Sequence, residues 1–156
     1  GKETPEDSIL LSWWDYGHWI TAVAKRRCVS DGATTNFTTI QRTAIAYMST
    51  EDVAKRIFKS FHVEYVIVPE HDFWLAGAFS TIVGNITDFP EGYYNYNPKS
   101  GGVSWNDLTA KGRNTTIYKL LFDQPDPEAN NFELIHVSPG SGSFTDTTVR
   151  IYKFNG

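Results

Sequence analysis

The stretch Trp13-Trp14-Asp15-Tyr16-Gly17 decides how the first part of this chain is expected to fold. A short apolar run at residues 8–12 precedes it and has the length of a strand. Residues 18–26 follow it and read as a helix ending in Lys25 and Arg26, two cations suited to the negative end of a helix dipole. The stretch therefore predicts a turn from a strand into a helix.

Two interpretations of this turn fit its residue types. In the structural one, the two Trp are core and rim aromatics, Asp15 caps free N–H groups of the helix, and the backbone requires Gly17. In the functional one, Trp13, Trp14 and Asp15 form a small pocket for a hydroxyl group. An indole N–H only donates and an ionised carboxylate only accepts, whereas a hydroxyl does both. The spacing leaves both interpretations open.

Length and composition indicate a folded protein of one domain. The chain has 156 residues, of which 40% are hydrophobic and 15% aromatic, enough to bury a core. Its formal charge is −4 and no run of Lys or Arg stands out, which argues against a nucleic-acid partner. The single cysteine, Cys28, cannot form an internal disulfide. No apolar stretch approaches the roughly 18–20 residues of a membrane span, so the piece itself is expected to be soluble.

Residue patterns in positions 1–84 predict a helix-rich core with short interleaved strands, as part of an α+β fold. Short β-branched or apolar runs predict strands at residues 8–12, 27–29 and 64–68. Apolar residues at helical spacing predict further helices, over residues 40–48, 53–61 and 72–83. A capping sequence at residues 49–52 separates two of these helices.

Residues 85–156 are expected to form a β-rich layer packed on the first part. The Pro- and Gly-containing segment 88–102 reads as a loop and residues 105–108 as one helical turn. Strands are expected at residues 115–122, 132–137 and 147–154. Because no repeat and no convincing linker separates the two parts, residues 1–156 are expected to form a single domain.

The remaining motifs point to no chemistry within this chain. The four His are scattered without partners at ligand spacing, which argues against a zinc site: His18, His62, His71 and His136. There is no phosphate-binding Gly-rich loop and no Gly-x-Ser-x-Gly elbow. Three Asn-x-Thr sequons, at Asn36, Asn85 and Asn114, fit an extracytoplasmic protein without proving one.

The five-residue stretch resembles the WWDYG signature of the catalytic subunit of N-oligosaccharyltransferases. These membrane enzymes glycosylate Asn in Asn-x-Ser/Thr sequons. The resemblance continues in the same order along most of the chain, and it is greatest to the C-terminal domain of archaeal members. The other similar segments are Ile20-Thr21-Ala22 with Ala24, Val29-Ser30-Asp31-Gly32, Tyr65-Val66-Ile67-Val68 and Val149-Arg150-Ile151-Tyr152-Lys153.

The resemblance implies a division of labour within a larger enzyme. It implies that the divalent metal, Mn or Mg, and the lipid-linked oligosaccharide bind the transmembrane part, so that this piece holds no catalytic residue and is inactive by itself. It assigns binding of the Ser/Thr hydroxyl, two residues after the acceptor Asn, to Trp13, Trp14 and Asp15, with Tyr16 and Gly17 shaping the turn. It also implies a multi-pass parent protein in the cell membrane, with this domain on the extracytoplasmic face.

The family has a second motif, Asp-x-x-Lys-x-x-x-Met or a version with Ile for Lys, and this sequence departs from it. Asp72 matches, but Leu75 stands where Lys or Ile is expected. A register shifted by one turn places Ile82 there instead, and a literal Asp-x-x-Lys occurs at Asp52 and Lys55, before the strand. Leu75 or Ile82 would supply a contact for the Thr methyl group. Lys55 is the less favoured candidate for this position.

Two rival interpretations stay open at this point. Exposed aromatic rings stack on sugar faces, so the aromatic-rich residues of positions 93–105 would also suit an extracytoplasmic carbohydrate-binding module. These residues are Tyr93, Tyr94, Tyr96 and Trp105. A purely structural ectodomain is the second rival.

Overall fold

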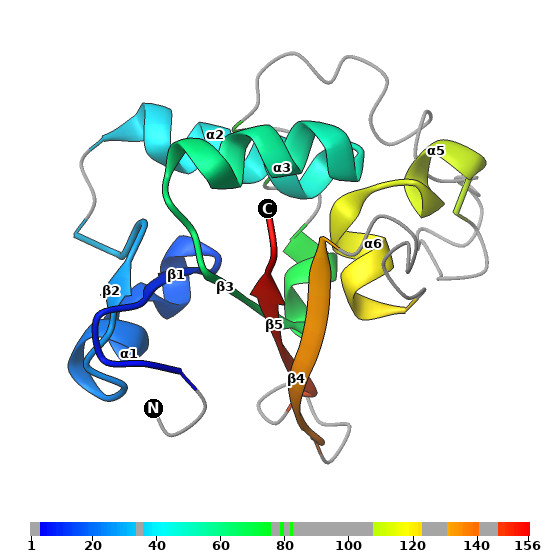
Figure 1. Ribbon diagram of the computed structural model, residues 1–156. Coiled ribbons are helices and arrows are strands. Elements are labelled where there is room, and N and C mark those ends of the chain that lie inside the picture. The colour runs from blue at the N-terminus through cyan, green and yellow to red at the C-terminus, as the bar shows by residue number, and fades with distance from the viewer. Residues whose placement is uncertain are drawn as a thin grey trace.

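The computed structural model describes residues 4–33, 36–75, 79, 82, 108–122, 131–140 and 147–156. In these residues the chain has an α+β fold, as predicted, built on a mixed five-stranded sheet of order β2-β1-β3-β5-β4. Figure 1 shows the sheet with helices α2 and α3 running above it. Across these ranges, no helix combines the length and the apolarity that crossing a lipid bilayer requires.

Three strands of the first part pair in parallel. They are β1 (Ile9–Leu11), β2 (Arg27–Cys28) and β3 (Tyr65–Pro69), with β1 in the middle of the three. These strands confirm the three that short apolar and β-branched runs predict in this part. Because parallel strands all end at the same edge of a sheet, the segments that follow β1, β2 and β3 are brought together there.

The two late strands join the same sheet in the antiparallel direction. β5 (Val149–Phe154) pairs along the whole of β3, and β4 (Phe132–Ser138) pairs with β5 on its far side. Both strands lie where the sequence predicts them. The strands of the second part therefore extend the sheet of the first part and share its core.

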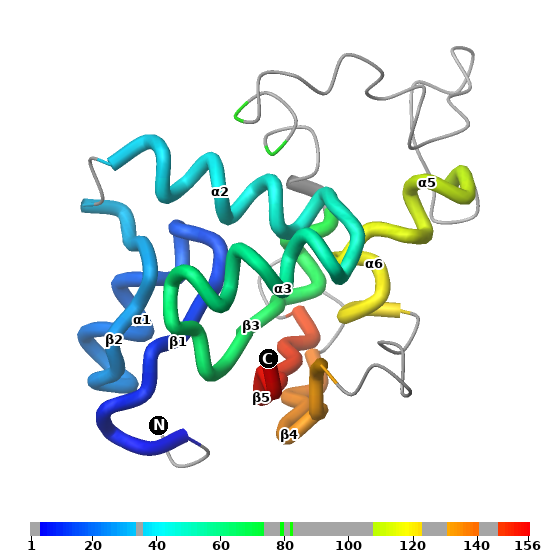
Figure 2. Tube along the Cα trace, turned by 45° about the horizontal axis from the view of Figure 1, so that its top comes forward, coloured from blue at the N-terminus to red at the C-terminus, as the bar shows by residue number. Residues whose placement is uncertain are grey.

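The helices α2 (Phe37–Met48) and α3 (Glu51–Ser60) confirm two predicted helices and pack against each other. Both tube and ribbon views show them side by side (Figure 2). The Asn36 side chain caps α2 by accepting a hydrogen bond from the Thr38 N–H at 3.1 Å. Thr50 stands at the N-cap of α3 as predicted, but its side chain makes no capping bond.

The predicted strand at residues 115–122 is wrong. This segment forms helix α6 (Thr116–Leu121), which follows the short helix α5 (Ala110–Arg113). The Thr115 hydroxyl caps α6, and the Thr116 N–H and hydroxyl both donate to the Ser49 carbonyl oxygen at 2.8 Å. This tertiary anchor at the end of α2 overrides the β-branched character of the segment.

The sheet buries a large core on one face and a smaller one on the other. The larger core is built by α2, α3 and α6 against alternate strand residues such as Val66 and Val68. The smaller core joins Leu10, Ile20 and Tyr65. The helix predicted for 72–83 begins as the 3-10 helix η2 (Glu70–Leu75), and residues 76–78 lie outside the described ranges. The loop expected at 88–102 and most of the turn expected at 105–108 lie outside them too.

Candidate functional site

The WWDYG stretch forms the turn that leaves the carboxyl end of β1. It consists of a 3-10 helix, η1 (Trp14–Tyr16), followed directly by helix α1 (Gly17–Ala22). The predicted helix over 18–26 is therefore shorter than expected. Lys25 and Arg26 lie beyond its end, with Lys25 at a positive φ of 53°. The Arg26 guanidinium donates to the Thr4 carbonyl at 2.6 Å and to the Ala24 carbonyl at 3.0 Å, so it joins the N-terminal segment to the turn that follows α1.

Asp15 does not cap the helix, which corrects the structural interpretation of this residue. The N-cap positions of η1 and α1 are Trp13 and Tyr16, and neither helix receives a side-chain capping bond. The Asp15 side chain is exposed, and within the described part of the chain it makes no hydrogen bond or ion pair. A carboxylate on a structured turn without an internal partner is available to an external donor.

Gly17 is required because the backbone of a neighbouring turn lies against it. A Cβ atom at this position would overlap the Ser30 carbonyl oxygen and the Asp31 Cα. The φ of Gly17 is −57°, so the requirement is for space and not for an unusual conformation. This contact holds the WWDYG turn against the turn that follows β2.

The two tryptophans of the turn have different surroundings. Trp13 is 2% exposed, and its ring meets that of Phe79 edge-on at 4.3 Å between centroids. Phe79 in turn contacts the ring of Tyr47, from α2, at 5.6 Å. Trp14 is only half-buried and packs at the border of the same core. The first indole thus anchors the turn, while the second reaches the surface beside Asp15.

Phe79 is a contact that sequence reasoning missed. It stands seven residues after Asp72, at the Met position of the second motif described above. That position is the signal from which the contact could have been predicted. Of the residues predicted for that motif, Leu75 ends η2 and Ile82 is half-buried against the larger core. Lys55 lies on α3 and donates to Asn131 Oδ1 at 2.6 Å, so it serves the junction with β4.

Asp72 follows β3 and lies at the same edge of the sheet as the WWDYG turn. Its side chain is completely buried, and neither carboxyl oxygen has a hydrogen-bond partner among the described residues. Burial raises the pKa of Asp72 well above its usual value, and the charge of Asp15 adds to this effect. Ser12 after β1 and Ser30 after β2 also bury hydroxyl oxygens without partners at this edge.

Two tyrosines are linked electrostatically to this acid. Burial raises the pKa of Tyr16 to about 12, and the charges of Asp72 and Asp15 add smaller effects of the same sign. Burial also raises the pKa of Tyr47, whose completely buried hydroxyl has no hydrogen-bond partner in the described ranges. Both phenols therefore keep their protons at neutral pH, and the edge combines one exposed carboxylate with buried polar groups.

Replacing Asp72 with asparagine is expected to change how stability depends on pH. Because its folded-state pKa is raised above 3.8, the folded protein holds a proton that the unfolded chain loses. Stability should therefore fall as pH rises from about 4 towards the folded-state pKa. The asparagine amide cannot titrate, so Asp72→Asn should be increasingly more stable than wild type over this range. Urea unfolding from pH 4 to 8 measures the difference.

The exposed Asp7 provides the matched control for this experiment. Asp7→Asn should follow the wild-type stability curve, since it leaves Asp72 buried. Parallel curves for Asp72→Asn and wild type would show that Asp72 does not hold an extra proton in the folded protein.

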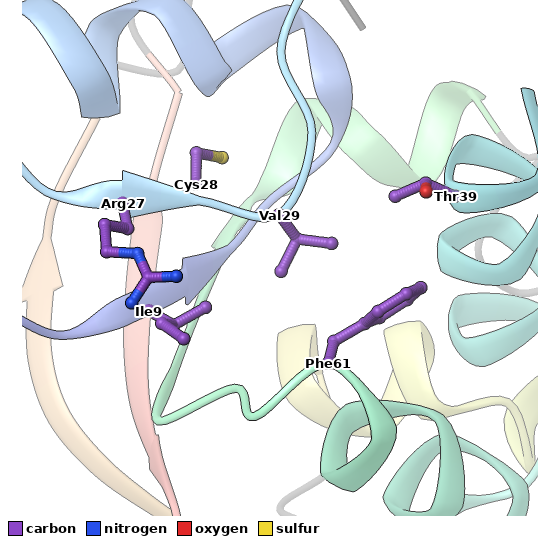
Figure 3. Close-up of a pocket in the computed structure, with 6 residues that line it drawn as sticks. All are labelled: Ile9, Arg27, Cys28, Val29, Thr39 and Phe61. Carbon is purple, nitrogen blue, oxygen red and sulfur yellow. The ribbon is translucent and has the colours of Figure 1, made fainter. Parts of the chain in front are cut away.

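A cavity lined by residues outside the WWDYG turn lies between the strands and the helices. It has a volume of about 200 Å³ and is lined by Ile9, Arg27, Cys28, Val29, Thr39 and Phe61. Figure 3 shows Phe61 and Thr39 approaching from α3 and α2, opposite Val29 from the strand side. None of the predicted site residues lines this cavity.

The described residues include no cluster of three His, Cys, Asp or Glu side chains that could hold a metal ion. The resemblance places the implied Mn or Mg in the rest of the enzyme, and nothing at this edge is derived through a metal. The aromatic residues considered for carbohydrate binding, Tyr93, Tyr94, Tyr96 and Trp105, lie outside the described ranges.

Comparison with known sequences finds a match in the part that carries the turn. Residues 2–72 match the family model of the AglB core domain. The STT3B subunit of rice dolichyl-diphosphooligosaccharide–protein glycosyltransferase is 43% identical over 67 residues, which are 43% of this chain and 9% of the relative. The corresponding STT3 subunit of Dictyostelium discoideum is 38% identical over 68 residues, covering 44% and 10%. The chain thus spans about a tenth of the length of these relatives.

Comparison with solved structures extends the likeness to the whole fold. The C-terminal globular domain of an oligosaccharyltransferase from Archaeoglobus fulgidus gives a TM-score of 0.61 at 22% identity, covering 97% of this chain and 88% of that one. An A. fulgidus oligosaccharyltransferase tethered with an acceptor peptide containing an NVT sequon gives 0.65 at 22% identity, covering 90% and 20%.

Proposed function

We propose that this chain, whose residues 2–72 match the family model of the AglB core domain, is the acceptor-recognition domain of a membrane N-oligosaccharyltransferase. In this proposal, it binds the Ser or Thr hydroxyl of an Asn-x-Ser/Thr sequon, two residues after the acceptor Asn. A similar fold occurs in an A. fulgidus enzyme that was tethered with a sequon-containing peptide. The likeness supports the placement of a peptide near this domain.

The observation that carries the proposal is the exposed Asp15 carboxylate, on a turn that the buried Trp13 anchors to the core. Asp15 has no internal partner within the described residues, and Trp14 lies beside it at the border of the core. Asp15 accepts a hydrogen bond from the sequon hydroxyl, and the Trp14 indole N–H donates a hydrogen bond to the hydroxyl oxygen. Trp13, buried against Phe79, anchors both side chains.

Such a site selects sequons by the cost of leaving its own polar groups unpaired. When a peptide without the hydroxyl binds, Asp15 and Trp14 stay unpaired in a desolvated contact. The free-energy cost is about 1–3 kcal/mol for each group. An apolar contact for the Thr methyl, from Leu75 or Ile82, adds up to about 0.8 kcal/mol over Ser. Of these two, Ile82 is half-buried against the core.

Binding here also orients the acceptor Asn amide for reaction, which can raise the rate as well as the affinity. In this proposal the lipid-linked oligosaccharide and a divalent metal, Mn or Mg, bind the rest of a multi-pass membrane protein. The domain faces the extracytoplasmic side. The 9% share of the rice relative that this chain covers leaves ample length for those functions.

Replacing Trp14 with phenylalanine in the full-length enzyme tests the donor role of the indole. The ring is kept but its N–H is lost, so kcat/KM for an Asn-x-Thr peptide should fall about 2- to 10-fold. The measurement is initial rates of transfer to a fluorescent peptide at varied peptide concentration. Trp19→Phe is the matched control, because Trp19 is 68% exposed on α1 and outside the motif. Equal losses for both variants would remove Trp14 from the site.

A further inference from the structure

We infer that Asn36 is an N-glycosylation site of the folded domain, whereas the fold itself closes the sequon at Asn114. The inference goes beyond the proposed function, because the chain is here the acceptor and not the enzyme. It concerns the two sequons whose residues the structure describes, Asn36-Phe37-Thr38 and Asn114-Thr115-Thr116. The third sequon, at Asn85, lies outside the described ranges.

The Asn36 sequon lies on the surface where α2 begins. Its three residues are all exposed, and Phe37 is 57% exposed. Figure 1 and Figure 2 both show the first turn of α2 at the outer edge of the molecule. Within the described residues, neither the Asn36 side-chain nitrogen nor the Thr38 hydroxyl has a hydrogen-bond partner. The two groups by which a sequon is recognised and modified are therefore accessible in the folded chain.

The contact that Asn36 makes within the fold is compatible with its modification. Its Oδ1 caps α2 by accepting a hydrogen bond from the Thr38 N–H at 3.1 Å, whereas the sugar is attached to the side-chain nitrogen. In that step the nitrogen forms a bond to the first sugar carbon of a lipid-linked oligosaccharide, and the bond from this carbon to the lipid phosphate breaks. The lipid phosphate leaves with the electron pair, and the nitrogen loses one proton to solvent. The capping oxygen keeps its bond.

The Asn114 sequon has the same residue types in a closed environment. Thr116 is 0% exposed, and its N–H and hydroxyl both donate to the Ser49 carbonyl oxygen at 2.8 Å. Thr115 is 4% exposed, and its hydroxyl donates to the Gly112 carbonyl oxygen at 2.8 Å. The hydroxyl that defines this sequon is thus engaged in the tertiary anchor between α6 and the end of α2.

Exposing the Asn114 sequon requires α6 to leave the larger core. The apolar residues that follow Thr116 on this helix are 1–2% exposed, namely Ile117, Leu120 and Leu121. Moving α6 into water loses their burial and breaks both bonds to Ser49. The first turn of α2 opens at much lower cost, because helix ends fray. The fold therefore leaves Asn36 available and restricts modification of Asn114 to the unfolded chain.

The test offers the full-length protein, purified unmodified from a host without N-glycosylation, to a separate active N-oligosaccharyltransferase with its lipid-linked oligosaccharide. Synthetic peptides of residues 32–40 and 110–118 serve as unfolded controls, and mass spectrometry of proteolytic fragments measures the modified fraction over time. Both peptides should be modified. In the folded protein, Asn36 should react within about threefold of its peptide, and Asn114 at least about tenfold more slowly than its peptide.

Asn36→Asp is the matched variant, because aspartate keeps an oxygen for the cap but has no amide nitrogen to modify. It should carry no sugar at this position and should match wild type in thermal unfolding. Equal modification of Asn36 and Asn114 in the folded protein would overturn the inference, as would a folded protein that leaves Asn36 unmodified. An Asn114 peptide that is not modified would also overturn it, since the local sequence and not the fold would then close this sequon.

Discussion

Replacing Asp15 with alanine in the full-length enzyme is expected to lower kcat/KM for an Asn-x-Thr peptide by about 10- to 100-fold. A hydrogen bond to a charged group contributes about 1.5–3 kcal/mol, which corresponds to this range. Because Asp15 is exposed and makes no bond within the described residues, its removal should leave the fold intact. Transfer to a fluorescent peptide, with saturating donor, measures the effect.

Two comparisons make the Asp15 result specific. Asp7→Ala removes another exposed acid from the N-terminal segment and should retain wild-type transfer. A peptide with Ala in place of Thr should be a poor acceptor for wild type and no poorer for Asp15→Ala, since the lost contact no longer exists. A variant with wild-type transfer to the Thr peptide would exclude Asp15 from acceptor recognition.

Replacing Phe58 with alanine is expected to lower the free energy of unfolding of the chain by about 3–5 kcal/mol. Phe58 is 0% exposed on α3, and its ring meets Phe132 at 6.0 Å and Phe154 at 5.5 Å, both edge-on. It thus joins the helices of the first part to both late strands. The loss is a large share of the roughly 5–15 kcal/mol that stabilises a typical domain. Urea unfolding followed by fluorescence measures it.

The same experiment tests the proposal that residues 1–156 form one cooperative domain. If α3 and the late strands share one core, wild type and Phe58→Ala should each unfold in a single transition. Phe37→Ala provides the control. Because Phe37 is 57% exposed, its replacement should lower the free energy of unfolding only slightly. Two separate transitions, with only one of them shifted by Phe58→Ala, would show that the two parts fold independently.

Local patterns predicted most of the described elements correctly. The β-branched run of β3 is largely buried, and the apolar stripe predicted for α2 is buried except for Ile45, which is half-buried. Helix α6 was missed because its sequence begins with Thr115 and Thr116, which favour strands by propensity. Its helical form depends on contacts to Ser49, 67 residues away in the chain, which no local pattern reports.

The turn that carries the candidate site was predictable from the sequence, but the packing that supports the turn was not. The WWDYG residues indicated a strand-to-helix turn, which the structure confirms between β1 and α1. Trp13 is buried by packing against Phe79, a residue distant in sequence, and the exposure of Asp15 is likewise seen only in the folded chain. Likewise, Asp72 matched a family motif, but only the fold shows that it is sealed from water.

The position of β5 in the sheet has a consequence for biosynthesis. β5 lies between β3 and β4, and Tyr65 of β3 pairs with Lys153. A ribosome delivers residues 149–154 long after β3 has emerged, so the nascent chain must wait with one edge of β3 unpaired. Contacts so distant in sequence form slowly, and an unpaired strand edge invites wrong partners. We expect the nascent domain to depend on chaperones until this strand is inserted.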